Sequence, residues 1–580
     1  MKNHRSILCA LLAIAMVLSF GSCTGTAGKG GVEEPAPPET ARAEPAPSGT
    51  APEEPPAAVT EPSDPPEDRP DLVILSREEY VNRPRGIQEG TVFSFGIVGA
   101  LSPYGALPWN VTPAGWLTGS VFEGLLYMYM NGPGDIRGCI AERWEHSDDY
   151  LMWTFHIRGG VTFTNGSPCD AAAVEKAWDY ISKEQQHYFA NNNIESWESS
   201  GSGKFVVRLS APCPWFEAAM CGGGFSVVDP YALTLYGPED VRAAVGTGPY
   251  FIDNDKYDPE NGIVLNANAA YYLEERMPCI QTGVFKPFGS AEEALNALIG
   301  GEIDGTVIGS PWKKFFTNSH YTDGHQYLLE EGYPGRIAVC PGASNPMWLN
   351  AKQAEIFTVP EVREAMCRFI DFASVNEQAF AGLGSVQDSL WAKGSSAYVR
   401  AEGFYCDPDE GLRLLASAGL EPSDISFEVV YYEEEVLLAV QRELEAVGVD
   451  MRLKPYDPSS SFTSLTREPV SFINPGYSNT SPYGPWKLIL PPGAPVKLCW
   501  QDIYDPGLYQ AMLDEYDAMS TALTWDDMLS HCRQITKYVQ DDFGAIGGVQ
   551  APVLIALNGD FKNGVYFTEN CHIQLYYLYK

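Results

Sequence analysis

The sequence predicts a mixed α/β protein with more than one globular domain. Residues 425–455 carry the clearest pattern, in which a strand (ISFEVVYY), an amphipathic helix (EEVLLAVQRELEAVG) and a second strand (VDMRLKPY) follow one another. Such an order forms a parallel strand pair with a right-handed crossover. The length of 580 residues also exceeds what one hydrophobic core accommodates.

Alternation and turn residues predict strands in the first half of the chain. The segment GTVFSFGIV (90–98) has the β-rich composition of a first strand. Trp153, Phe155 and Ile157 alternate with polar residues, which places them on a buried face and His156 on the solvent face. After a turn at Gly159-Gly160, a second short strand is expected at 161–163, followed by a turn at Asn165-Gly166.

Two polar motifs resemble catalytic features but are interpreted as hairpin turns. Asp148 and Asp149 lie between two strand patterns, so a turn is preferred over a pair of catalytic carboxylates. The segment SGSGKF (200–205) resembles the end of a phosphate-binding loop. It lacks the first glycine of that motif and has Phe205 where a Ser or Thr must reach Mg²⁺.

Apolar residues recur with helical periodicity in the segments 114–129, 170–181, 290–304 and 359–373. Asp170 is expected to cap the second of these helices. Gly300 and Gly301 are expected to end the third. In the fourth, Arg363 is predicted to lie on the solvated face or to pair with an acid.

The formal net charge of −37 excludes two classes of partner. Nucleic-acid binding requires a basic surface that neutralises phosphates, so no nucleic-acid partner is expected. An anionic membrane surface would likewise repel the body of the protein.

The N-terminus predicts an exported lipoprotein. Lys2 and Arg5 precede an apolar run that is shorter than the about 20 residues of a membrane-spanning helix. The following Gly21-Ser22-Cys23 resembles a bacterial lipobox, so residues 1–22 are expected to be a signal peptide and Cys23 the lipidated residue. An ordinary signal peptide with a coincidental cysteine is the alternative.

Residues 23–70 are rich in proline and acidic residues and contain no aromatic residue. Such a segment cannot bury enough apolar surface to offset its ordering entropy. We expect an extended, disordered tether that holds the folded body away from a membrane.

Motifs typical of catalytic or metal sites are sparse in this sequence. Of the 13 cysteines, those other than Cys9 and Cys23 are expected to be buried apolar residues, with one or two disulfides among them. No CxxC, HExxH or GxSxG motif in the required context is present, and the 8 histidines do not cluster. The chain is therefore predicted to be neither an enzyme nor a metal or cofactor binder, and a secreted hydrolase is the least favoured function.

Several aromatic residues instead lie in Pro-, Gly- and Asn-rich segments: Trp109, Trp116, Trp348, Tyr477, Tyr483 and Trp486. Aromatic side chains in loops suit a cleft that covers a small molecule or a peptide. For each of them, core packing is an equal alternative.

Several blocks together resemble one family. They are VFEGLLYM (121–128), CIAERWEHSDDYLMWTFHIRGGVTFTNGSPCDAAAVEKAWDYI (139–181), GTGPYFI (246–252), NANAAYYLEERMPCI (266–280), GGEID (300–304), FTVPEVREAMCRFIDFASVNEQAFAGLG (357–384) and YCDPDEGLRLLASAGL (405–420). In this order they are similar to the bacterial extracellular solute-binding proteins of family 5, the peptide/nickel class that serves ABC importers. The resemblance covers residues 90–580 and contributes most of the functional prediction.

The resemblance implies a two-lobed clamp of the type II periplasmic-binding-protein class with an additional small subdomain. Lobe I would comprise 71–117, 243–338 and 498–580, the inserted subdomain 118–242, and lobe II 339–497. Segments near 335–345 and 490–500 would cross between the lobes. The protein would be an extracytoplasmic monomer, anchored to the cell membrane by its lipid, that passes a peptide or peptide-like solute to the permease subunits of an ABC importer.

The same resemblance points to a ligand site at Tyr104, Trp109, Gly476, Tyr477, Asn479, Thr480, Tyr483 and Trp486. In peptide binders of the family an aspartate near Asn479 and Thr480 receives the peptide's amino terminus, and a neutral group pairs poorly with a desolvated ammonium. The early loop LSP (101–103) also lacks the family's usual acid. An N-blocked peptide, a glycan-like solute or a metal chelate therefore stays open, as does a ligand-sensing receptor of the same fold.

Overall fold

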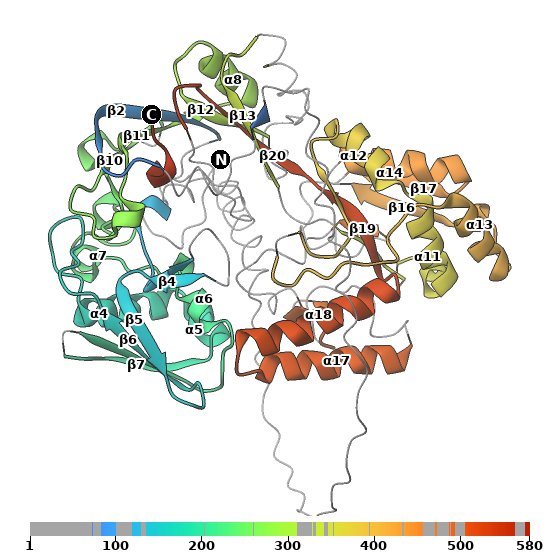
Figure 1. Ribbon diagram of the computed structural model, residues 1–580, viewed down its shortest axis with the longest axis horizontal. Coiled ribbons are helices and arrows are strands. Elements are labelled where there is room, and N and C mark those ends of the chain that lie inside the picture. The colour runs from blue at the N-terminus through green and yellow to red at the C-terminus, as the bar shows by residue number, and fades with distance from the viewer. Residues whose placement is uncertain are drawn as a thin grey trace, which may run out of the picture. The chain divides into compact units, whose positions relative to one another are not determined.

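The computed structural model describes the chain in segments. These are residues 72–73, 83–99, 119–128, 135–201, 203–258, 260–309, 328, 332–341, 346–351, 353–393, 395–431, 434–455, 470–472, 486–487, 489–492, 505–562 and 575–580. The described residues form a mixed α/β structure with several sheets, which confirms the predicted α/β class (Figure 1).

The largest sheet has eight strands. Their order is β1 (Leu72–Val73), β13 (Arg336–Pro341), β20 (Pro552–Leu557), β12 (Gly305–Gly309), β2 (Gln88–Val98), β11 (Ile280–Phe288), β10 (Ile263–Ala267) and β9 (Tyr250–Ile252). β2 contains the predicted first strand and runs parallel to both β11 and β12. Helix α8 (Ala291–Ile299) ends before Gly300 and Gly301, as predicted, and is capped at its start by Ser290.

A separate antiparallel sheet lies within residues 141–209. Its order is β5 (Ala141–His146), β6 (Met152–Ile157), β8 (Lys204–Leu209) and β7 (Ile194–Ser200). Helix α4 (Ala171–Glu184) begins at Asp170, whose side chain accepts a hydrogen bond from the amide of Ala173, as predicted. The helices α5 (Gln186–Asn191), α6 (Phe216–Ala219) and α7 (Pro230–Tyr236) complete this region.

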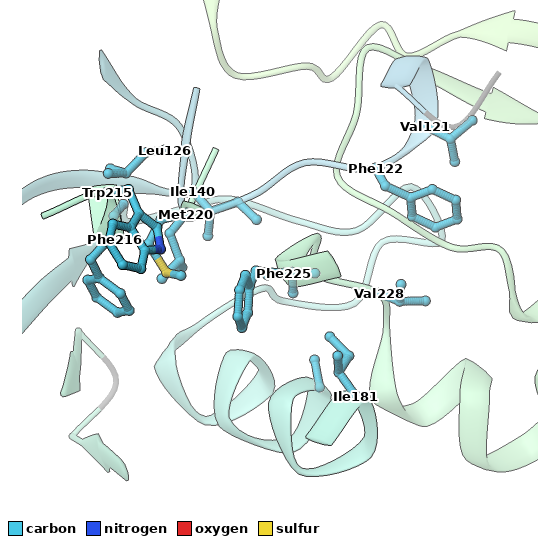
Figure 2. Close-up of a cluster of buried hydrophobic side chains, with 14 of the residues drawn as sticks. Val121, Phe122, Leu126, Ile140, Ile181, Trp215, Phe216, Met220, Phe225 and Val228 are labelled. Atoms are coloured by element: carbon cyan, nitrogen blue, oxygen red, sulfur yellow. The ribbon is translucent and has the colours of Figure 1, made fainter. Parts of the chain in front are cut away.

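Apolar side chains from several of these segments form one core. Trp215, Phe216 and Met220 gather near Leu126 and Ile140, as Figure 2 shows, and all five are buried. Leu126 belongs to β3 (Leu126–Met128), Ile140 directly precedes β5, and the other three residues lie in or next to α6. The core therefore holds the four-stranded sheet of residues 141–209, called the small sheet below, against β3.

The predicted hairpin turns are present. β5 and β6 are antiparallel neighbours, and Asp149 accepts hydrogen bonds from the hydroxyl of Ser147 and the amide of Leu151. β7 and β8 are likewise antiparallel around Gly201, so SGSGKF is a hairpin. The expected strand at 161–163 is only an isolated bridge between Thr162 and Pro168.

The helix predicted at 114–129 is wrong over residues 122–128. Residues 119–121 are helical, but Leu126–Met128 form strand β3, paired with β4 (Ile136–Gly138). A Cβ on Gly124 would lie 2.3 Å from the carbonyl oxygen of Met220, so an extended backbone packs tightly there. The segment is buried on all sides, and a continuous apolar run does not distinguish a helix from a buried strand.

His156 is buried rather than exposed to solvent. It is 7% exposed, and its Nε2 lies 3.1 Å from a carboxylate oxygen of Glu145 on the neighbouring strand. On the same face of β6, Met152 is exposed and Thr154 is half-buried, so His156 is covered locally while the rest of this face keeps contact with solvent. Alternation places a residue on a face, but it does not reveal whether that residue is solvated.

The second half of the chain contributes two further sheets. Four strands have the order β15 (Ser385–Gln387), β19 (Ala545–Gln550), β14 (Pro346–Leu349) and β18 (Val470–Phe472). The strands β16 (Ser426–Tyr431) and β17 (Asp450–Pro455) are parallel and are joined by α14 (Glu434–Val447), which confirms the predicted strand–helix–strand unit.

The helix predicted at 359–373 is divided in two. α11 (Pro360–Phe369) ends before Asp371, which caps α12 (Phe372–Phe380) by accepting a hydrogen bond from the amide of Ala373. A further helix, α13 (Pro408–Ser417), packs against α11.

Arg363 is a pairing residue rather than a solvated one. It is 1% exposed, and its guanidinium lies 2.7 Å from a carboxylate oxygen of Asp542. It also donates to the backbone carbonyls of Phe357, Thr358 and Asp542. These acceptors satisfy a buried cation that periodicity alone assigns to the surface.

Two adjacent segments pass between the large sheet and the four-stranded sheet. In the eight-stranded sheet β13 pairs with β20, and in the four-stranded sheet β14 pairs with β19. Both pairings are antiparallel. The chain thus changes sheets between Pro341 and Pro346, within the predicted crossing at 335–345. It changes sheets again at Ala551, between β19 and β20.

Two long helices precede the second crossing. α17 (Pro506–Thr521) and α18 (Trp525–Asp541) pack against each other, and α18 leads into β19 (Figure 1). The predicted crossing at 490–500 lies mostly outside the described residues.

Candidate functional site

Most of the predicted ligand contacts lie outside the described residues. These are Tyr104, Trp109, Gly476, Tyr477, Asn479, Thr480 and Tyr483, as well as the predicted lipidation residue Cys23 and the aromatic residue Trp116. Their roles stay predictions.

Trp486 is described and is a core residue. Its side chain is fully buried, and its indole ring centroid lies 6.2 Å from that of Trp391 in an edge-on arrangement. Its indole N–H donates to Sγ of Cys532, 3.3 Å away. Trp348, another of the loop aromatics, is 1% exposed in β14. Both tryptophans therefore pack in the core, which was the alternative to a place in a ligand cleft.

One face of α18 receives hydrogen bonds from two separate chain segments, one at Leu390-Trp391 and one at Trp486. Cys532, Thr536 and Gln540 are spaced four residues apart and therefore share a face of the helix. Cys532 accepts from Trp486, and Oγ1 of Thr536 accepts from the indole of Trp391 at 2.8 Å. Gln540 accepts from the amide of the residue before Trp391 at 3.0 Å. The sequence analysis did not identify this face, although its four-residue spacing of small polar residues was visible.

A hydrogen bond links the residue after Trp486 to the region of the small sheet. Nζ of Lys487 donates to Oδ1 of Asn191 at 3.3 Å, across 296 residues of sequence. Asn191 is the last residue of α5, and its side-chain nitrogen Nδ2 is buried with no hydrogen-bond partner among the described residues.

A buried polar cluster joins the segment around β3 to the region between β10 and β11. The carboxylate of Glu123 lies 2.8 Å from the guanidinium of Arg276 and accepts hydrogen bonds from the hydroxyls of Tyr271, Tyr272 and Thr247. Each acceptor lone pair of this buried carboxylate therefore has a donor. The sequence analysis quoted these residues within the family blocks but assigned them no role.

The cysteines are free thiols where the structure describes them in full: Cys139, Cys169, Cys213, Cys221, Cys279, Cys367, Cys406 and Cys532. The disulfides expected from the sequence are thus absent from this set, while the expected burial holds for most of it. Burial raises the pKa of the Cys532 thiol to about 12, so this thiol stays protonated and is a poor nucleophile.

No group of three or more His, Cys, Asp or Glu side chains suited to a metal ion occurs among the described residues. The same residues contain no helix long and apolar enough to cross a membrane. Asp148 and Asp149 form a turn, and SGSGKF forms a hairpin. What the described geometry offers is two sheets joined by paired crossing strands, an arrangement that permits hinge motion.

Comparison with known proteins gives one family. A family model described as bacterial extracellular solute-binding proteins, family 5 Middle, matches residues 135–490. The chain is similar to the glutathione-binding protein GsiB of Escherichia coli O1:K1 / APEC, with 25% identity over 367 residues, which are 62% of this chain and 67% of that protein. It is also similar to the nickel-binding periplasmic protein of Escherichia coli (strain K12), with 25% identity over 295 residues, which are 49% and 53% of the two chains.

Solved structures agree on the fold. NikA from Brucella suis in complex with Fe(III)-EDTA superimposes with a TM-score of 0.70 at 19% identity, covering 84% of this chain and 99% of that one. The ABC transporter substrate-binding protein CtaP from Listeria monocytogenes also gives a TM-score of 0.70, at 18% identity and with coverage of 85% and 99%. The predicted type II periplasmic-binding-protein fold is therefore confirmed.

Proposed function

The chain belongs to family 5 of the bacterial extracellular solute-binding proteins, and from this premise we propose that it captures a peptide or peptide-like solute between two lobes and delivers it to an ABC importer. Members of this family are extracytoplasmic binding proteins and not enzymes. The family match over residues 135–490 is the observation that carries the proposal.

The crossing strands support a clamp mechanism. β13–β14 and β19–β20 are the segments at which the chain changes sheets, and they pair with each other on both sides of the change. Rotation at these strands would interconvert an open and a closed form that exist in equilibrium without solute. A solute can shift that equilibrium only by as much as it prefers the closed form.

A peptide-like solute is favoured by the similarity to a protein named for glutathione binding, since glutathione is itself a short peptide. The residues proposed to contact it are those predicted from the sequence, with Tyr477, Asn479 and Thr480 at the centre of the site. Because neither Asn479 nor Thr480 carries a charge, we propose a solute that places no free ammonium against these two residues. The ammonium of a glutathione-like solute would therefore have to lie elsewhere in the site.

The decisive experiment is native mass spectrometry of the full chain purified without denaturation, followed by thermal-shift measurements. A retained solute should appear as a discrete added mass. A free solute concentration of 100 times the Kd should raise the free energy of unfolding by about 2.7 kcal/mol. If no solute is retained and glutathione, N-acetylated tripeptides and free tripeptides all leave the melting temperature unchanged, the peptide proposal fails.

A charge-restoring variant tests the ligand segment directly. Thr480→Asp places an acid where the family's peptide binders have one, so affinity for free-amine tripeptides should rise by about tenfold or more. The matched control is Thr480→Asn, which adds similar bulk without charge and should leave that affinity unchanged. Equal affinities for both variants would remove Thr480 from the proposed site.

A metal chelate is the second candidate solute. It is favoured by the similarity to a nickel-binding protein and by the fold shared with a protein that holds Fe(III)-EDTA. Stabilisation by Ni²⁺ with a chelator, and not by either component alone, would select it over the peptide.

Membrane attachment through Cys23 is a further part of the proposal. Cells that express the full chain should retain it in the membrane fraction, and Cys23→Ala should release it, because a lipid anchor requires the thiol. Cys9→Ala, which changes a cysteine within the proposed signal, is the matched control and should leave the protein attached.

A further inference from the structure

The crossing segment β19–β20 is an inner strand in both of the sheets that it joins. β19 lies between β15 and β14 in the four-stranded sheet, and β20 lies between β13 and β12 in the eight-stranded sheet (Figure 1). Only Ala551 separates β19 from β20, and it pairs with no strand among the described residues. A change in the backbone angles of Ala551 therefore breaks none of the described strand pairings.

The strand pairing also lacks donors on the large-sheet side of Ala551. Pro552 is the first residue of β20, and its register partner is Pro341, the last residue of β13. Proline has no N–H group, so neither residue can donate a hydrogen bond to the opposite strand. The pairing of β13 with β20 is therefore weakened at the end that adjoins Ala551.

On the other side of Ala551, the short strand β15 holds the crossing segment. β15 is the edge strand of the four-stranded sheet and pairs with β19 as far as Gln550, which directly precedes Ala551. β14, the other neighbour of β19, pairs no further than Gly548 among the described residues. Within the described part of the chain, β15 is thus the strand that holds Val549 and Gln550.

The side chain of Asn376, in α12, holds the start of β15. Its Oδ1 accepts a hydrogen bond from the amide of Gly384 at 2.9 Å, and its Nδ2 donates one to the carbonyl of Gly384 at 3.0 Å. Asn376 is 9% exposed, so water competes little for these two bonds. Gly384 directly precedes β15, and its position relative to the sheet is therefore determined by Asn376.

The close approach at Gly384 joins this contact to the crossing segment. A Cβ on Gly384 would lie 2.5 Å from Oδ1 of Asn376 and 2.9 Å from the carbonyl oxygen of Gln550. Both distances are shorter than van der Waals contact, so a residue with a side chain would separate β15 from Asn376 or from β19.

We propose that Asn376 is a positioning residue, which holds β15 against β19 and thereby confines the bend of the crossing segment to Ala551. Without this support, Val549 and Gln550 would bend as well, and the angle between the two sheets would be less defined. The inference rests on the proposed function, because it assumes that the crossing strands bend when the two lobes close. Asn376 acts through β15 and not through contact with the solute.

Hydrogen–deuterium exchange of the full chain without solute tests the support independently of ligand identity. Asn376→Ala removes both hydrogen bonds to Gly384, so exchange at 384–387 and at 549–550 should accelerate by about tenfold. Exchange at 553–557 in β20 should stay unchanged, because those residues lie beyond Ala551. Equal acceleration in β20 would show a general loss of stability and would overturn the proposal.

Asn266→Ala is the matched control for this variant. Nδ2 of Asn266 donates to Asp253 at 3.1 Å in the eight-stranded sheet, so its loss should leave exchange at 384–387 and 549–550 unchanged.

Gly384→Ala reaches the same contact without changing Asn376 and keeps the test valid if Asn376→Ala fails to fold. The added Cβ pushes β15 away from its neighbours, so exchange at 549–550 should accelerate by about fivefold. Gly159→Ala is the matched control, because a Cβ there would meet nothing within 4 Å. Unchanged exchange at 549–550 in both Asn376→Ala and Gly384→Ala would overturn the proposal.

An affinity measurement separates positioning from simple stabilisation. With glutathione as the probe, Asn376→Ala should weaken binding by about threefold, since a loosened crossing segment must be ordered again when the lobes close. Asn266→Ala should leave the Kd unchanged, and an unchanged Kd in Asn376→Ala would overturn the positioning role. If the unmodified protein does not bind glutathione, that choice of solute fails, and the exchange experiment still decides whether Asn376 supports the crossing segment.

Discussion

Two buried ion pairs in this protein have different surroundings. In the Glu123–Arg276 pair the side chains are 1% and 7% exposed, so neither charge reaches water. In the Arg363–Asp542 pair the arginine is 2% exposed and the aspartate 23%. If either Glu123 or Arg276 is replaced, the charge that remains has no access to solvent. If Arg363 is replaced, Asp542 can still be hydrated or protonated.

The surroundings of the two arginines explain what each pair does. Arg276 lies between the rings of Tyr127 and Tyr576, with its guanidinium carbon 4.9 Å and 4.7 Å from their centroids. It thereby ties β3 and the C-terminal segment 575–580 to the large sheet. Arg363 donates mainly to backbone carbonyls and ties α11 to the end of α18. Both charges of the Glu123–Arg276 pair therefore depend on each other for compensation, whereas Asp542 keeps partial access to water.

The largest expected effect is at the fully buried pair. Glu123→Gln keeps the shape of the side chain but leaves Arg276 charged, buried and without a counterion, which should lower the free energy of unfolding by about 3–5 kcal/mol. Urea unfolding followed by tryptophan fluorescence measures the loss. Glu217→Gln is the matched control, because that carboxylate accepts only from Trp144 among the described bonds and should cost less than about 1 kcal/mol.

Removing both partners sharpens this result. The double variant Glu123→Gln/Arg276→Met should be less destabilised than the sum of the two single variants, because no uncompensated charge remains. If the losses in the free energy of unfolding were additive, Glu123 and Arg276 would contribute independently. The view that two buried charges depend on each other would then be wrong.

Arg363→Met should cost about 2–3 kcal/mol at neutral pH, because several buried hydrogen bonds are lost while Asp542 stays partly hydrated. Burial already raises the pKa of Asp542, and the nearby arginine opposes that rise. Removal of the arginine should raise the pKa further. The folded protein then binds the proton more tightly than the unfolded chain does.

The sign of the pH dependence follows. An aspartate whose pKa is raised on folding adds stability as the pH falls through its folded pKa, until the pH reaches its unfolded pKa of about 3.9. The cost of Arg363→Met should therefore be largest at neutral pH and should shrink on acidification. In Arg363→Met/Asp542→Asn this pH dependence should disappear, and melting curves between pH 4 and 8 measure both.

A smaller effect is expected from the aromatic contact at Arg276. Tyr576→Leu removes one of the two rings beside the guanidinium and should cost about 1–2 kcal/mol, since the cation is desolvated. The exposed stack of Arg242 on Tyr236, with the guanidinium carbon 4.5 Å from the ring centroid, provides the control. Tyr236→Leu should cost about 0.5 kcal/mol or less, and equal losses would show that burial does not strengthen the contact.

The smallest effect is expected at an exposed pair. Arg452 and Asp450 are 53% and 51% exposed, so Arg452→Gln should change the free energy of unfolding by less than about 0.5 kcal/mol. A loss as large as that of Arg363→Met would contradict the view that solvent access decides the strength of these pairs.

Local patterns predicted much of the fold. The strand–helix–strand unit at 425–455, the hairpins at Asp148-Asp149 and Gly201, and the cap at Asp170 depend on residues within a few positions of each other. The ligand segment at 476–486 was predicted through resemblance rather than from local chemistry, and only its last residue is described. Trp486, which was predicted to contact the ligand, is buried against Trp391 and Cys532.

By itself, the sequence determined the α/β class, the turns and caps, the acidic charge and the family. Only the tertiary structure decided the strand at Leu126–Met128, the burial of His156, the pairing of Arg363 and the cluster at Glu123. The physical reason is separation along the chain: Glu123 and Arg276 are 153 residues apart, and Arg363 and Asp542 are 179 apart. Periodicity reports which side chains share a face, but the folded chain decides what covers that face, and so whether a charge there meets water or a partner.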